Sequence, residues 1–334
     1  MSFAVRAAAT LLAACASLVA AAAYAEPANP PIQYVIISFD SAQHVEQWKR
    51  SRALAARTGS TFTYFLSCVF LLAPEHKREY QGPGERPGKS NIGFAASEAD
   101  VAARLQQIWL AQSEGQEIGS HGCGHFDGSN WSRADWNSEF KSFRHILANA
   151  WTINGIAGEP AGWREFAADA PQGFRAPYLA TDKELYRALA DSRFTYDASG
   201  VSRGPGQPAP EGGVIRFALP QIPEGPASRP VIAMDYNMFV RHSGGFERDD
   251  RDAVFENRAY EAFKRAFRSE YEGKRMPLEL GFHFTLMNGG AYWRALERFA
   301  DEVCVKPDVA CVSYADYIAR NGALAKAAAA QLGG

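Results

Sequence analysis

Short strand-like segments alternate along the chain with segments that have the apolar spacing of a helix. The first strand-like segments are Tyr34–Phe39 and Phe62–Leu66, and the helical pattern follows at Val45–Ala56 and Glu98–Gln112. Further strand-like segments lie at residues 117–120, 173–175, 194–196, 231–234, 278–284 and 310–312, and helical patterns follow most of them. This alternation is typical of βαβ units and predicts an α/β fold with seven or eight strands.

Two segments interrupt the alternation, residues 74–93 with Gly82-Pro83-Gly84 and residues 200–230, which are dense in Pro and Gly. Both patterns indicate long surface loops. Because strands continue on either side, we interpret the loops as insertions into a single barrel domain that spans residues 33–321. Residues 26–32 would then be a linker, and the Ala-rich residues 322–334 a tail that ends in a frayed helix.

The first 25 residues have the pattern of a secretory signal peptide: Arg6, an apolar run over residues 7–22, and the small-residue cleavage site Ala23-Tyr24-Ala25. We therefore expect an exported protein, periplasmic or extracellular. Cys15 offers the alternative of a lipoprotein anchor, but the apolar run continues past it, which favours simple cleavage. After residue 26 no apolar run is long enough to cross a bilayer.

Charge and cysteine content narrow the function further. The 35 Lys and Arg residues nearly balance the 37 Asp and Glu residues, which argues against a nucleic-acid-binding protein. Four cysteines remain after cleavage, in a compartment that permits disulfides. Cys304 and Cys311 flank a turn and are close enough to be bridged, the alternative being two buried thiols. Cys68 and Cys123 each follow a strand-like segment and could also meet.

Candidate catalytic groups stand where the predicted strands end. Asp40 ends the first strand, at the edge where α/β barrels build their active sites, although an Asp can also cap a helix there. His121 and His125 follow residues 117–120 in a Gly-rich turn. Two imidazoles at this spacing can bind one divalent metal, whereas the alternative is a chance pair of surface histidines.

Two later strands end in further polar residues. In Arg175-Ala-Pro177, the proline favours an extended backbone before it, and the arginine can hold a carboxylate. His283 lies in an apolar strand near the same edge. Taken singly, Arg175 would more often form a surface ion pair, and His283 would more often be a hydrogen-bonded core residue. Asp197 or Asp235 could orient His283, although each could equally cap a strand end.

The order of these motifs resembles that of the polysaccharide deacetylase family, the carbohydrate esterases that deacetylate chitin, peptidoglycan and related glycans. The resemblance covers most of residues 33–320 and implies a distorted (β/α)7 barrel with one divalent metal, usually zinc. It also implies a metal-dependent deacetylase of a cell-envelope glycan that carries N-acetyl or O-acetyl groups. The implied roles are general base for Asp40, metal ligands for His121 and His125, a clamp on the base for Arg175, a backbone donor to the oxyanion for Tyr178, and general acid for His283.

The sequence departs from the family pattern at one position. The family normally has a second Asp directly after the first as the third metal ligand, and here that residue is Ser41, a weak ligand for a divalent cation. Asp127 and His44 are the nearest candidates to replace it. The departure favours one alternative, a metal-poor glycan-binding pseudoenzyme. A related metal-dependent hydrolase of small amides, sharing the barrel, is the second alternative.

Overall fold

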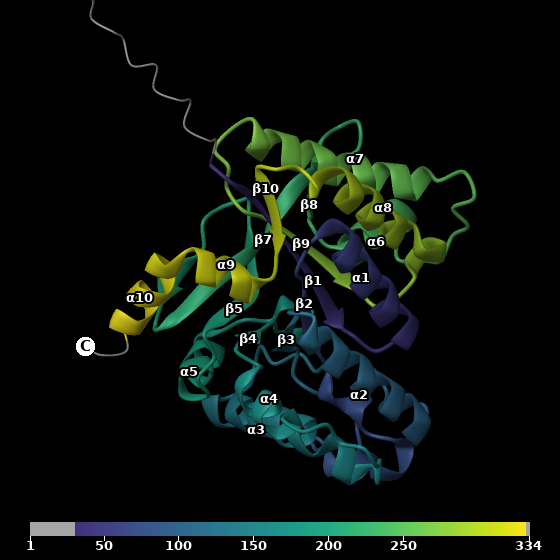
Figure 1. Cartoon of the computed structure of the whole chain (residues 1–334), viewed down its shortest axis with the longest axis vertical. Helices are drawn as coiled ribbons and strands as arrows, with labels where there is room; N and C mark the ends of the chain where they lie inside the picture. Colours follow the sequence, from purple (N-terminus) through teal and green to yellow (C-terminus); the bar gives the residue numbers. More distant parts are fainter. Residues whose placement is uncertain (1–30, 332–334) are drawn as a thin grey trace, which may run out of the picture. The chain divides into compact units, whose positions relative to one another are not determined.

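The computed structural model of the chain describes residues 31–331. The predicted signal peptide and Cys15 lie outside the described residues. At the centre, parallel strands follow one another around a strongly curved sheet, and helices pack against its outer face (Figure 1). In order around the sheet, these strands are β1 (Gln33–Ser41), β2 (Thr63–Leu66), β3 (Glu117–Ser120), β4 (Gly173–Phe174), β5 (Tyr196–Ser202) and β7 (Val214–Glu224).

The sheet closes on itself through β9 (Leu278–His283), which pairs with β1 on the side away from β2. Between β7 and β9 the chain supplies only a short bridge: the Ala233 N–H donates to Pro220 O of β7, and the Gly281 N–H of β9 donates to Ala233 O. This irregular closure confirms the predicted distorted (β/α)7 barrel. Outside the ring, β10 (Val309–Val312) pairs with the first half of β1.

The prediction of a surface loop over residues 200–230 is wrong. The segment contains β7, and two short strands pair antiparallel with it, β6 (Ala209–Glu211) and β8 (Arg229–Ile232). Prolines at positions 220 and 223 hid the strand, because proline cannot donate to a central ladder. The structure places Pro223 opposite Pro230 of β8, where the two prolines share one register position.

The helices follow the predicted alternation, with two additions. The expected helices are α1 (Val45–Thr58), α2 (Glu98–Ser113), α3 (Arg133–Ile153), α5 (Lys183–Asp191), α7 (Val254–Tyr271), α8 (Met287–Val303) and α9 (Tyr314–Arg320). The additional ones are α4 (Trp163–Asp169) and α6 (Asp235–Ser243). Within residues 74–93 the only regular element is a short 3-10 helix, η2 (Pro74–Glu79), so this segment is the predicted long loop. None of the described helices is both long and apolar enough to span a membrane.

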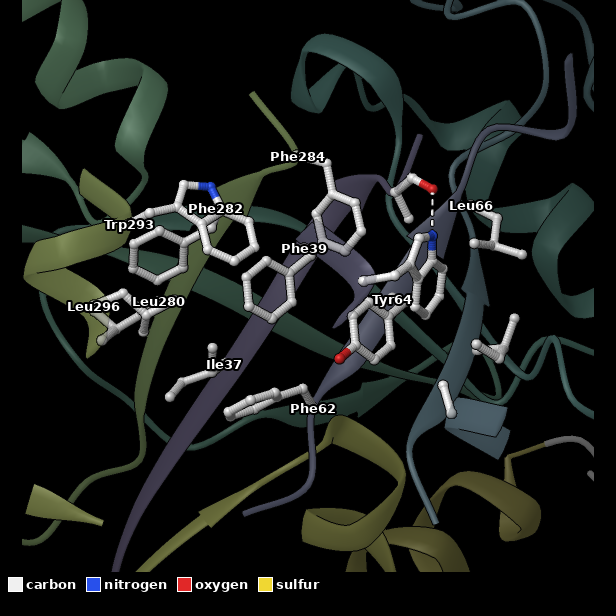
Figure 2. Packing of buried hydrophobic residues seen from close by; sticks show 14 of the residues in the cluster. Ile37, Phe39, Phe62, Tyr64, Leu66, Leu280, Phe282, Phe284, Trp293 and Leu296 are labelled. Carbon is white, nitrogen blue, oxygen red and sulfur yellow. Dashed lines mark hydrogen bonds between the residues drawn. The ribbon is translucent and has the colours of Figure 1, made fainter. Parts of the chain in front are cut away.

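Strand alternation decides which side chains face the barrel interior. In β1, Val35, Ile37 and Phe39 pack outward against the helices, whereas Ser38 and Asp40 face inward. Figure 2 shows the outward layer, where the Phe39 ring lies 5.1 Å from Trp293 of α8. The same alternation that builds the core therefore points Asp40 at the carboxyl end of the barrel.

The Phe39 position allows a test of this core. Phe39→Ala should lower the free energy of unfolding by about 3–5 kcal/mol, because a buried ring is lost and its cavity remains. Denaturant unfolding followed by circular dichroism measures the change. Phe246→Ala is the matched control: that ring is 69% exposed, and its removal should change stability by less than about 0.5 kcal/mol. Equal losses in the two variants would contradict the assigned core.

Both cysteine pairs form disulfides, Cys68–Cys123 and Cys304–Cys311. The first joins the short 3-10 helix η1 (Cys68–Leu71) to the turn after β3. The Ala-rich tail forms α10 (Gly322–Ala330), and Ala328 is buried against the core residues of β5 and β7, so this helix packs on the barrel.

Candidate active site

A cleft of about 450 Å³ opens at the carboxyl ends of the barrel strands. Its lining includes five of the residues predicted from the sequence: Asp40, His121, His125, Tyr178 and His283. The barrel brings them together because parallel strands end at one edge. Arg175 has no exposed surface and lies behind the cleft wall, in contact with Asp40.

Asp40 and Arg175 form a buried ion pair. Nη1 of Arg175 donates to Oδ1 of Asp40 at 2.9 Å. Burial alone would disfavour the carboxylate, but the Arg175 guanidinium outweighs it and holds the pKa of Asp40 below its ordinary value of 3.8. Asp40 is therefore ionised at neutral pH and can accept a proton from a molecule in the cleft.

The guanidinium of Arg175 makes three further hydrogen bonds inside the barrel. Nε donates to Ala198 O at 3.0 Å, Nη1 donates to Ser38 Oγ at 2.8 Å, and Nη2 donates to Tyr314 Oη at 2.7 Å. These partners come from three different elements, so the orientation of the planar fork is fixed. The sequence did not reveal Ser38 or Tyr314, although Ser38 stands two residues before Asp40 on the same face of β1.

His283, at the end of β9, is paired with Asp235, the first residue of α6. Its Nδ1 lies 2.7 Å from Oδ1 of Asp235, and its backbone N–H donates to Oδ2 at 2.8 Å. Since a carboxylate only accepts, Nδ1 carries a hydrogen and Nε2 is the nitrogen left for a ligand. Burial opposes the charged imidazole, but Asp235 outweighs it and raises the pKa of His283 above 6.5.

Of the two acids considered for His283, the structure therefore selects Asp235. Asp197 instead accepts a hydrogen bond from Ser199 Oγ at 2.6 Å, and the Ala176 N–H donates to the same hydroxyl. Asp197 thus supports the backbone after β4. The short bridge that closes the barrel ends at Met234, directly before Asp235, and this closure is what brings Asp235 to His283.

His121 and His125 lie side by side, with ring centroids 5.1 Å apart. Nδ1 of His121 lies 2.7 Å from Arg175 O, and because a carbonyl only accepts, the unprotonated nitrogen is Nε2. Burial lowers the pKa of His121 to about 3 and lowers that of His125 as well, so both rings are neutral at pH 7. Nδ1 of His125 is buried without a hydrogen-bond partner.

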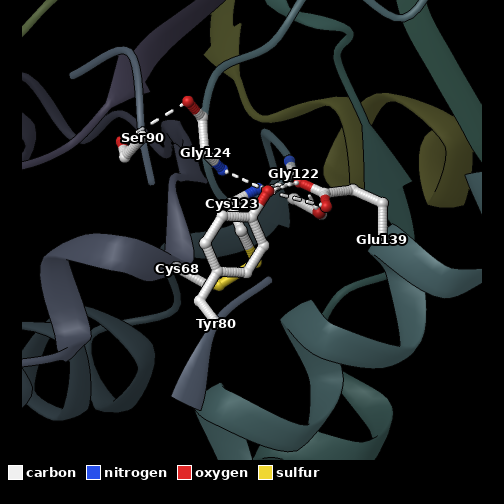
Figure 3. The surroundings of a disulfide bond; sticks show 8 residues. Cys68, Tyr80, Ser90, Gly122, Cys123, Gly124 and Glu139 are labelled. Atoms are coloured by element: carbon white, nitrogen blue, oxygen red, sulfur yellow. Dashed lines mark hydrogen bonds between the residues drawn. A yellow bond between two sulfur atoms is a disulfide. The ribbon is translucent and has the colours of Figure 1, made fainter. Parts of the chain in front are cut away.

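The turn that carries these histidines is held from three sides (Figure 3). The Cys68–Cys123 disulfide joins it to η1, and the carboxylate of Glu139 on α3 accepts the Cys123 N–H at 2.6 Å. The hydroxyl of Tyr80 accepts the Gly124 N–H at 3.0 Å and donates to Glu139. These ties keep the two imidazoles at the cleft. Glu139 and Tyr80 carry no local sequence signal that would have identified them.

The structure does not bring a third ligand to the histidine pair. Asp127 is exposed and accepts the Ser129 N–H in a local turn, while His44 precedes α1, without a side-chain capping bond, outside the cleft. Ser41 lines the cleft because its backbone turns to a φ of 67°, which ends the alternation of β1. Within residues 31–331 no group of three His, Cys, Asp or Glu residues is placed to hold a metal ion.

Two tyrosines stand at the mouth of the cleft. Tyr178, after β4, is 61% exposed and packs edge-on against His125 at 4.7 Å. Tyr236, which follows Asp235, is 53% exposed and lies 6.2 Å from the His283 ring. Exposed aromatic rings suit the flat faces of sugar rings or other planar groups. The sequence singled out Tyr178 for its backbone N–H and did not single out Tyr236.

No protein-family model and no curated protein matches the sequence. Solved structures do match the fold. A protein from Mycobacterium smegmatis described as a polysaccharide deacetylase is 15% identical, with a TM-score of 0.53 over 88% of this chain and 92% of that one. A protein from Pseudomonas aeruginosa PAO1, also described as a polysaccharide deacetylase, is 16% identical, with a TM-score of 0.50 over 88% and 94%.

An allantoinase structure matches equally well, at 16% identity and a TM-score of 0.50 over 88% of this chain and 93% of that chain. At such identities the likeness concerns the path of the backbone, and the activity must be argued from the cleft. The distorted barrel and these matches together show that the chain has the polysaccharide deacetylase fold.

Proposed function

We propose that this protein is a hydrolase that removes acetyl groups from the amide nitrogen or ester oxygen of an acetylated glycan. The observation that carries the proposal is the pairing of Asp40 with Arg175 and of His283 with Asp235 in one cleft. One pair supplies an ionised carboxylate and the other an imidazole with a raised pKa. Hydrolysis of an acyl bond needs a base and an acid of this kind.

In the proposed reaction, Asp40 takes a proton from the attacking water as its oxygen adds to the acetyl carbonyl. The resulting tetrahedral species collapses when Nε2 of His283 donates its proton to the departing nitrogen or oxygen. Asp235 stabilises the charged imidazole before this transfer and fixes its orientation. By the family resemblance, the Tyr178 backbone N–H would donate to the oxyanion.

We further propose that His121 and His125 bind one divalent metal, with Zn²⁺ the expected ion. The neutral rings, the free Nε2 of His121 and the unpartnered Nδ1 of His125 fit a cation that prefers nitrogen ligands. When bound, such a metal polarises the carbonyl and acidifies water. With two protein ligands in place of the usual three, we expect weak binding.

The expected activity is release of acetate from N-acetylated chito-oligosaccharides, peptidoglycan fragments or acetylated xylan. Small cyclic amides are a second substrate class in the same assay, because the cleft is small and an allantoinase shares the fold. If the protein hydrolyses only small amides, these become the proposed substrate class in place of acetylated glycans. Folded protein that hydrolyses neither class, with or without added zinc, would contradict the hydrolase proposal.

The pH dependence of the reaction follows from the two pairs. The rate should fall as the pH drops through the pKa of Asp40, below 3.8, because the base becomes protonated. It should also fall as the pH rises through the pKa of His283, above 6.5, because the acid loses its proton. Initial rates across the pH range test this. Asp235→Asn should move the alkaline limb to lower pH, and an unmoved limb would remove His283 as the acid.

A further inference from the structure

A second carboxylate lies behind the Asp40–Arg175 pair, deeper in the barrel. Glu279 stands on β9, two pleats before His283 and on the same inward face. It is 1% exposed. Its Oε2 accepts a hydrogen bond from Tyr314 Oη at 2.9 Å, and the same hydroxyl accepts from Nη2 of Arg175 at 2.7 Å. A continuous line of hydrogen bonds thus runs from Glu279 to Asp40.

When Glu279 is ionised, the direction of each hydrogen bond in this line is fixed. The Tyr314 hydroxyl has one hydrogen, which it donates to Glu279, and its lone pair faces the arginine. Oε1 of Glu279 accepts the Ala218 N–H from β7 at 3.2 Å. The other charged group that acts on Glu279 is Asp197 on β5. Among the groups that act most strongly on Glu279, Arg175 is the cation, and the hydrogen bonds couple Glu279 to Asp40 through it.

The proposed reaction changes the charge beside Arg175. When Asp40 takes a proton it becomes neutral, and the fully buried Arg175 loses the counter-charge that it contacts directly. An uncompensated buried cation is costly, so without a second acid Arg175 would oppose the proton transfer. Glu279 is placed to balance that charge, because it is linked to Arg175 by hydrogen bonds through Tyr314, whereas the buried Asp197 acts on Arg175 without a place in this line.

We propose that Glu279 is a positioning residue that acts through Tyr314 on Arg175, holding the guanidinium in place and balancing its charge while Asp40 carries the proton. Its catalytic consequence rests on the proposed function, but the coupling itself does not. Burial raises the pKa of Glu279 to about 7, so the acid changes its charge near neutral pH, where the effect can be switched on and off.

The coupling can be measured without any substrate. In protein labelled with ¹³C-glutamate, the titration of the Glu279 carboxyl carbon, assigned with the Glu279→Gln variant, should move to lower pH in Asp40→Asn. Removal of the Asp40 charge strengthens the attraction of Arg175 for Glu279, which favours the ionised form of that acid. Asp127→Asn, which removes an exposed carboxylate outside the cleft, should leave the titration unchanged. An unmoved Glu279 titration in Asp40→Asn would overturn the proposal.

The kinetic measurement distinguishes positioning from a merely structural role. Above about pH 8, Glu279→Gln should lower kcat on the order of tenfold with little change in KM, and below about pH 6 it should match the wild type. A structural defect would lower kcat at every pH. The control is Glu117→Gln, a half-buried acid that accepts a hydrogen bond from the Tyr196 hydroxyl at 2.8 Å and, among the described residues, makes no bond to Arg175. An equal loss of kcat at every pH in both variants would overturn the proposal. If the wild type shows no activity, the shift of the Glu279 titration in Asp40→Asn decides the proposal.

Discussion

Asp40→Asn should lower turnover by about 10²–10⁴-fold, the contribution typical of a general base. The amide keeps the volume of the carboxyl group, and its oxygen can still accept the bond from Nη1 of Arg175, which is 2.9 Å long in the wild type. It cannot take a proton from water at neutral pH. The fold and the histidine pair should therefore persist while the reaction stops.

Acetate release, a melting curve and zinc content, measured on the same preparation, test this prediction. Asp127→Asn is the matched control, because Asp127 is exposed and bonds only within its own turn among the described residues. A variant with wild-type turnover would remove Asp40 as the base. Loss of the fold in Asp40→Asn would show instead that the ion pair with Arg175 is mainly structural.

The acid should respond differently from the base. His283→Ala should slow N-acetyl substrates far more than activated O-acetyl esters, because an amine anion leaves poorly without a proton and a stabilised alkoxide leaves readily. The Asp235 carboxylate stays in place in this variant, so the difference between substrates reports on the proton donor. Equal losses on both substrate types would mean that His283 does not protonate the leaving group.

The sequence predicted the residues of the cleft better than their partners. Asp40, His121 and His283 could be found because they end strands, and parallel strands end at one edge. The sequence left both Asp235 and Asp197 as candidates to orient His283. It could not decide between them, because the contact of Asp235 with His283 depends on the irregular closure at residues 233–234. Glu279 was not found at all, because its role depends on a side-chain line that joins β9 to α9.

The prediction of a loop over residues 200–230 failed for a physical reason. Pro-rich β7 was interpreted as a loop, because proline weakens an isolated strand, whereas the neighbouring strands stabilise it in the barrel. Asp127 and His44 stand near the motifs in sequence, yet neither lines the cleft that holds His121 and His125. Ser41 shows the opposite case: its positive φ, which no local pattern indicated, turns it into the cleft beside Asp40.

That backbone makes Ser41 a suitable position to test the metal proposal. Asp is among the residues that tolerate a left-handed conformation, so Ser41→Asp should fold without added strain. It would place an anionic oxygen in the cleft with the nitrogens of His121 and His125. We expect zinc to bind the variant on the order of tenfold or more tightly than the wild type, since a third, charged ligand completes the common set.

Calorimetric titration of metal-free protein with zinc measures the gain, and no activity is needed to observe it. Replacing both His121 and His125 with Ala should abolish binding in the wild type and in Ser41→Asp, because one carboxylate alone holds zinc poorly. Asp127→Ala should change neither affinity. Unchanged zinc affinity in Ser41→Asp would show that residue 41 does not reach the ion, and binding that survives the loss of both histidines would place the metal elsewhere. A tighter site that also raises acetate release would mean that a missing ligand, and not the base or the acid, limits the natural cleft.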